Sequence, residues 1–128
     1  MVNVALEKPQ KIQDRSFDFA FRIVSLHEDL CSKRGAARVI ARQLLKSGTS
    51  IGANLEEASA AQSKPDFISK GSIASKEARE TRDWLLTACK SIDTERIAPL
   101  VIEAGEIVAI VTTIVKNAEL NSQFKIQH

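Results

Sequence analysis

Residues 43–57 read QLLKSGTSIGANLEE, and the polar side chains of this stretch recur in alternating steps of four and three residues. Residues three and four apart lie on the same side of an α-helix. This spacing defines a polar seam of Gln43, Ser47, Ser50, Asn54 and Glu57. A parallel apolar seam runs beside it and consists of Ile40, Leu44, Ile51, Leu55 and Ala58. A surface helix needs only one apolar stripe, so polar residues in heptad register predict a seam packed against another helix and shielded from water.

The composition supports a helical fold with an aliphatic core. The chain has 128 residues, enough for one domain, and is 44% hydrophobic but only 5% aromatic. Its five glycines and three prolines are too few for a turn-rich sandwich or barrel. The net charge of +2 does not by itself require a polyanionic partner. With two distant cysteines, Cys31 and Cys89, no leader and no long apolar run, we expect a cytoplasmic protein with two independent thiols and no membrane partner.

The three-and-four rhythm continues along the chain and predicts four helices, at about 16–30, 36–61, 64–90 and 94–118. Residues 1–15 and 119–128 are expected to be tails. Ser16 is placed to cap the first helix, and Ser63 with Pro65 and Asp66 marks the start of the third. Short links between long helices predict an all-α, antiparallel up-down four-helix bundle over residues 16–118.

Two of these helices carry more apolar residues than one bundle core needs. The first has two stripes, one with Phe17, Phe21 and Val24 and the other with Phe19, Ile23, Leu26 and Leu30, and is expected to be heavily buried. The surplus on the fourth helix predicts a subunit interface and consists of Val101, Ile102, Val108, Ile110 and Val115. The alternative is a generously buried central helix.

Gly48 and Gly52 lie in the same stretch as the polar seam, where each lowers helix propensity by about 1 kcal/mol relative to alanine. One interpretation breaks the helix at this point. We favour a continuous helix because the heptad register passes through both glycines without a slip. Their spacing of four then creates a notch in which another backbone can approach closely.

A basic ridge follows the second helix, because Arg34, Arg38, Arg42 and Lys46 recur every four residues and Lys33 precedes them. Such a ridge favours contact with nucleic-acid phosphates. No aromatic residue interleaves with it, so base stacking is not provided. The alternative is a solvated face whose basic side chains cover apolar surface.

The sequence gives little support for catalysis. His27 and His128 are the only histidines, and no nucleophile elbow or phosphate loop is present. Glu77 and Glu80 on the third helix extend the polar seam, but a di-metal bundle requires Glu-x-x-His pairs. We expect no catalytic residues, no metal site and no cofactor. Glu57 and Glu77 are expected to pair with bundle amides or with nearby cations, which are Lys64, Lys70, Arg79 and Arg82.

SGTSIGANLEEASAAQSKPDF (residues 47–67) and SIASKEARETRDWL (residues 72–85) resemble the four helix bundle protein family. Its bacterial members include proteins encoded by intervening sequences within 23S ribosomal RNA genes. The resemblance covers about residues 16–118 and implies a left-handed bundle that assembles as a ring, a homopentamer. It implies no enzymatic activity, and a genomic setting does not specify a ligand.

Taken together, these patterns predict a non-enzymatic homo-oligomer with an RNA-associated or adaptor role and no small-molecule substrate. A phosphate-backbone binder that uses the basic ridge is the alternative, and an enzyme with a carboxylate metal site is a weaker one.

Overall fold

The computed structural model describes the backbone of residues 10–127 and the side chains of residues 10–121. Four helices account for nearly all of this part: α1 (Ile12–Leu30), α2 (Ala36–Ser59), α3 (Lys64–Ser91) and α4 (Thr94–Gln127). Residues 10–127 contain no β-strand. The all-α fold is therefore confirmed, while residues 1–9 and 128 of the predicted tails lie outside the described residues.

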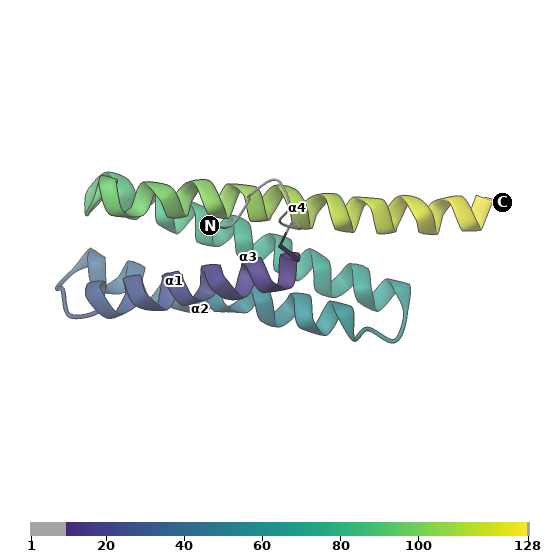
Figure 1. Ribbon diagram of the computed structural model, residues 1–128, viewed down its shortest axis with the longest axis horizontal. Coiled ribbons are helices and arrows are strands. Elements are labelled where there is room, and N and C mark those ends of the chain that lie inside the picture. Colours follow the sequence, from purple (N-terminus) through teal and green to yellow (C-terminus); the bar gives the residue numbers. More distant parts are fainter. Residues whose placement is uncertain (1–9, 128) are drawn as a thin grey trace, which may run out of the picture.

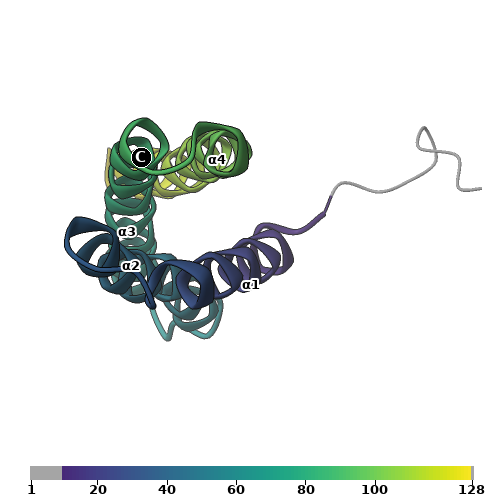
Figure 2. The same cartoon turned by 90° about the vertical axis from the view of Figure 1, so that its left-hand side faces the viewer.

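The helices follow one another around the core, and the chain turns back at each short connection (Figure 1). Contacts join α1 to α2, α2 to α3 and α3 to α4, whereas α1 and α4 make far fewer contacts with each other. Seen along the helices, the four rods form an arrangement that is open between α1 and α4 (Figure 2). The two outer helices are therefore the less enclosed members of the bundle.

The core is aliphatic apart from Phe19, close to what the composition predicts. Its largest fully buried side chains include Phe19, Ile23, Leu44, Leu85 and Ile107. The inner face of α3 is built mainly from small residues, which allows α2 and α4 to pack closely against it: Gly71, Ala74, Ala78, Thr81 and Ala88.

The first helix begins at Ile12, four residues before the predicted start. Ser16 is not its cap but a helical residue with a fully buried side chain, and Lys11 occupies the cap position. Ile12 packs against the core and Asp14 lies in the first turn, which favours the earlier start. Only one of the two predicted stripes is buried. Phe17 and Phe21 are 64% and 69% exposed, so the expectation of heavy burial all round α1 is wrong.

The second helix is continuous through Gly48 and Gly52 and ends at Ser59, two residues before the predicted end. Ser63 caps α3 as predicted, because its Oγ accepts a hydrogen bond from the backbone N–H of Asp66 at 3.2 Å and Pro65 lies in the first turn. This cap fixes where the chain re-enters a helix.

The fourth helix continues to Gln127, so the predicted tail from residue 119 is wrong as far as residue 127. Residues 119–127 contain no glycine or proline that would stop a helix. This end of α4 extends beyond the other three helices (Figure 1). Val108 and Val115, counted above among the surplus apolar residues, are buried within the chain, whereas Ile102 is 66% exposed.

The segment Thr94–Asn121 of α4 is long and apolar enough to cross a membrane, because an 18-residue window within it has a mean hydropathy of 1.9. One such helix is weak evidence, because a core helix of a soluble protein passes the same test. Leu100, Ala104, Ile107 and Val111 place one face of α4 in the bundle core.

Candidate functional site

The polar seam is enclosed at one point, where Ser47 of α2 meets Thr81 of α3. Both side chains are buried, and their hydroxyl oxygens lie 2.8 Å apart. Ser47 Oγ donates to the backbone carbonyl of Gln43 at 3.0 Å, while Thr81 Oγ1 lies 2.7 Å from the carbonyl of Glu77. Thr81 Oγ1 has one proton, which it donates either to Ser47 Oγ or to the carbonyl of Glu77. Both buried hydroxyls therefore have a hydrogen-bond partner, as buried polar groups must.

The remainder of the seam is less enclosed than the sequence predicts. Gln43, Ser50 and Asn54 are half-buried, and Glu57 is exposed. Ser50 Oγ donates to the carbonyl of Lys46 at 2.7 Å, and Asn54 Nδ2 donates to the carbonyl of Ser50 at 2.9 Å. These bonds stay within α2, so in the single chain the seam is shielded at Ser47 and opens toward Glu57.

The acidic residues of the seam do not converge. Glu57 forms an ion pair with Lys70 of α3 at 3.0 Å, and the hydrogen bond and charge of Glu57 raise the pKa of Lys70. This is one of the cation partners that the sequence predicts for Glu57. Glu77 is half-buried and Glu80 exposed. Among the described residues no group of three His, Cys, Asp or Glu side chains could hold a metal ion.

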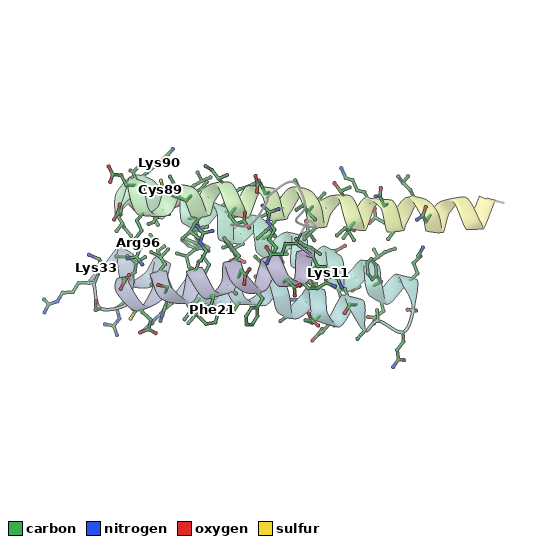
Figure 3. All side chains as sticks on the ribbon, viewed as in Figure 1. Lys11, Phe21, Lys33, Cys89, Lys90 and Arg96 are labelled. Atoms are coloured by element: carbon green, nitrogen blue, oxygen red, sulfur yellow. The ribbon has the colours of Figure 1, made fainter. Side chains whose placement is uncertain are left out.

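The basic ridge is fully exposed along its length. Lys33, Arg34, Arg38, Arg42 and Lys46 all reach solvent, and Lys33 projects from the end of the molecule where α1 connects to α2 (Figure 3). None of the five forms an ion pair with another side chain in the described part of the chain. Arg38, Arg42 and Lys46 form a row on α2, whereas Lys33 and Arg34 lie in the connection before its first residue. Gly35, with a φ of 70°, separates them from the helix, so the predicted ridge is helical only from residue 38 onward. The five side chains together still present uncompensated positive charge.

The two glycines of the notch face α1. A Cβ atom at Gly48 would lie 2.9 Å from Ile23 Cγ2, which is closer than real Cβ contacts come. At Gly52 the nearest atom would be Ser16 Cβ, at 3.8 Å. Gly48 thus sets how closely α1 approaches α2. Ser16 lies in the same contact, and its Oγ has no hydrogen-bond partner within the described residues.

The two thiols lie near the same end of the molecule and are both free. Cys31 Sγ lies 3.5 Å from the carbonyl of Glu28, and Cys89 Sγ lies 3.6 Å from the carbonyl of Thr94. Each thiol therefore has a backbone acceptor near its own helix end, in the way that two independent, half-buried cysteines behave.

The polar contacts that join α1 to α4 are not predicted by any pattern in the sequence. Arg15 Nε and Nη2 donate to the two carboxylate oxygens of Glu103 at 2.8 and 2.7 Å, and Nη2 also contacts Glu106. Arg96 pairs with Asp29 nearer the other end of the same two helices. Arg15 was assigned to the tail, and no local pattern links it to a carboxylate 88 positions away. These ion pairs bridge α1 and α4, which pack against each other much less than the three pairs of helices that are consecutive in the chain.

The Arg15–Glu103 pair predicts a loss of stability in acid. Hydrogen bonds from Arg15 lower the pKa of Glu103 from its ordinary value of 4.5, against the opposing effect of partial burial. A carboxylate with a lowered pKa stabilises the fold above its unfolded pKa, and this contribution disappears as pH falls through the folded-state pKa. Between about pH 6 and pH 3, wild type should lose about 1 kcal/mol more stability than Arg15→Met. Urea unfolding at several pH values tests this, and equal acid slopes for the two proteins would contradict it.

Comparison with known proteins agrees with this architecture. The sequence model of the 23S rRNA-intervening sequence protein family matches residues 8–113, which include α1 to α3 and the first part of α4. The chain is also similar to a crystal structure, at 1.70 Å resolution, of a protein of unknown function from the S23 ribosomal protein family of Bacteroides thetaiotaomicron VPI-5482. The two are 39% identical with a TM-score of 0.76, over 83% of this chain and 99% of that chain. No curated protein matches the chain. The resemblance carried by residues 47–67 and 72–85 is thus confirmed, and this chain belongs to the 23S rRNA-intervening sequence protein family.

Proposed function

We propose that this chain is the subunit of a non-enzymatic, cytoplasmic homo-oligomer with an RNA-associated or adaptor role. In this proposal its helices form an antiparallel, left-handed up-down bundle, and the bundles assemble as a ring, a pentamer. The reversal of the chain at each connection supports the bundle topology (Figure 1). The family resemblance and the exposed apolar surface of α1 support the proposed ring.

The observation that carries the oligomer is the outward stripe of α1. Phe17 and Phe21 are more than half exposed, and Val24 is 39% exposed one turn further on. The rings of Phe17 and Phe21 lie against each other with centroids 5.9 Å apart, so they form a continuous apolar patch. Large apolar side chains gathered on one exposed face are typical of subunit interfaces.

Sedimentation velocity of the full chain tests the assembly. We expect a species several times the 14.1 kDa subunit mass that persists at micromolar concentration. A stable monomer under these conditions would remove the oligomer and, with it, the scaffold role.

The second candidate function is binding of RNA phosphates by the basic ridge. Its support is the group of exposed cations on α2 and on the connection before it, which form no ion pair with any side chain of residues 10–121. Five copies in a ring would repeat this row, and repeated weak contacts can add to a useful avidity. A protein that binds in this way contacts the phosphate backbone of the RNA and does not recognise its bases.

Reversing one charge of the ridge should weaken RNA binding in a salt-dependent way. We expect Arg42→Glu to lower affinity for a structured RNA at low salt and to reduce the slope of log K against log salt by about 1. Lys90→Glu, an equal change of charge at an exposed site on α3, serves as the control and should leave the slope unchanged. Fluorescence anisotropy across a salt series measures both. Equal effects of the two substitutions, or no binding by wild type at low salt, would exclude the ridge.

A further inference from the structure

We propose that the outer groove between α3 and α4 binds a phosphate monoester. The groove has a volume of about 330 Å³ and lies where the two helices pack side by side (Figure 1). Its lining is rich in hydroxyl and cationic groups: Ser72, Ser75, Lys76, Arg79, Thr112 and Lys116. A volume of this size lies within the range of small-molecule sites. It is separate from the polar seam and from the ridge on α2, so the inference depends on neither.

The hydroxyl groups of the groove are already positioned by contacts between the two helices. Ser75 Oγ of α3 and Thr112 Oγ1 of α4 lie 3.0 Å apart, and both side chains are half-buried. Arg79 Nη2 donates to Thr112 Oγ1 at 3.3 Å, which holds the guanidinium over the groove. A serine, a threonine and an arginine from two helices thus converge before any ligand arrives. Such preorganised donors lose less conformational entropy on binding an anion.

The groove carries a net positive charge, which favours binding of an anion. Lys76, Arg79 and Lys116 form no ion pair with any side chain of residues 10–121, and Glu119 is the one carboxylate in the lining. Three cations against one carboxylate leave two positive charges uncompensated at neutral pH. Arg79 donates to a neutral hydroxyl, so its other N–H groups remain available for bidentate contact with phosphate oxygens.

A phosphate monoester matches this balance better than a phosphodiester. A monoester carries about −1.5 to −2 charges at neutral pH and three acceptor oxygens, whereas a diester carries a single charge. Val115 also lines the groove and gives it an apolar part that suits the organic portion of an ester. Two sources share this chemistry: a free nucleotide and the 5′-phosphate of an RNA end.

Calorimetric titration of the full chain with adenosine 5′-monophosphate, and with adenosine as its uncharged counterpart, tests the site. We expect the monophosphate to bind and adenosine not to bind. Lys76→Gln/Arg79→Gln should weaken binding at least roughly tenfold, because the ligand would lose the binding free energy of one or two charge-assisted hydrogen bonds. Lys90→Gln, an exposed position near the end of α3, should leave it unchanged. Both residues of the double variant are exposed, so the fold should persist, and circular dichroism checks this.

A second measurement identifies whether the monoester comes from a free nucleotide or from an RNA 5′ end, and it distinguishes binding in the groove from binding to the ridge. A short RNA is compared in its 5′-phosphorylated and 5′-hydroxyl forms. A preference for the phosphorylated form that disappears in Lys76→Gln/Arg79→Gln supports the groove and assigns it to RNA ends, whereas binding of the free monophosphate alone supports it and assigns it to nucleotides. Absence of both effects, or monophosphate binding unaffected by the double substitution, overturns the inference. RNA that binds equally with and without its 5′-phosphate, in a protein that does not bind the free monophosphate, overturns it too, while leaving binding by the ridge intact.

Discussion

Gly48→Val is expected to lower the free energy of unfolding by about 3 kcal/mol, as overpacking of a tight core contact does. Even the first added carbon would lie 2.9 Å from Cγ2, 3.1 Å from Cγ1 and 3.3 Å from Cβ of Ile23. Ile23 is fully buried, so it has no free space into which it could rotate. The extra methyl groups of valine would therefore push α1 away from α2 and disturb the contact that the glycine allows.

Gly105→Ala is the matched control for this substitution. Apart from the adjoining residues and the backbone of its own helix, no atom lies within 4 Å of the position that a Cβ would take at Gly105, which is also helical. Alanine should stabilise α4 there by up to about 1 kcal/mol through its higher helix propensity. Urea unfolding followed by circular dichroism measures both variants, at equal protein concentration because self-association shifts apparent stability. A Gly48→Val protein that unfolds at the wild-type midpoint would show that α1 does not depend on this close approach.

Phe17→Asp/Phe21→Asp is expected to convert the oligomer to a folded monomer. The two rings are 64% and 69% exposed in the single chain, so replacing them should cost the subunit itself little. In a subunit interface, two buried and unpaired carboxylates at about 2 kcal/mol each would weaken self-association roughly a thousandfold. Loss of assembly without loss of helicity is therefore the expected signature.

Phe17→Leu/Phe21→Leu provides the control, since it keeps the stripe apolar and should retain assembly. Sedimentation velocity gives the mass of each variant, and circular dichroism reports its helix content. If the aspartate variant sediments like wild type, the outward stripe of α1 is not part of the interface and another surface must carry the assembly.

In the proposed ring, the copies of the chain would present the basic ridge and the α3–α4 groove repeatedly. Two surfaces of positive charge on different helices would then serve different phosphate chemistry: internal phosphates along α2 and a terminal monoester between α3 and α4. The salt series on Arg42→Glu and the comparison of RNA ends address these two surfaces independently. Membership of the family does not by itself specify a ligand, so both predictions rest on the residues of the two surfaces.

The helical organisation could be predicted from local patterns. The three-and-four rhythm through residues 43–57 carries the second helix across Gly48 and Gly52, and Ser63 with Pro65 marks the start of the third. These signals are local, because the period of a helix and the chemistry of its cap involve residues only a few positions apart. The same patterns also revealed the family.

The candidate sites were predicted less completely. The helical part of the ridge, Arg38, Arg42 and Lys46, was predictable because its residues share one helix at a spacing that the sequence displays directly, whereas Gly35 separates Arg34 from that helix. The pairing of Ser47 with Thr81, the ion pair of Arg15 with Glu103 and the groove around Arg79 each join two helices. Which residues of two helices meet depends on the rotation and axial shift of one helix against the other, which no single-helix pattern contains.

The amino-acid sequence by itself determined that this protein consists of helices, where α2 and α3 begin, and which residues lie on one face of each. The tertiary structure alone decided that the stripe of Phe19 and Ile23, rather than that of Phe17 and Phe21, faces the core. It also decided that the seam is closed at Ser47 and open at Glu57. The physical reason is that periodicity defines faces within a helix, whereas the choice among faces follows from the apolar area that all four helices can bury together.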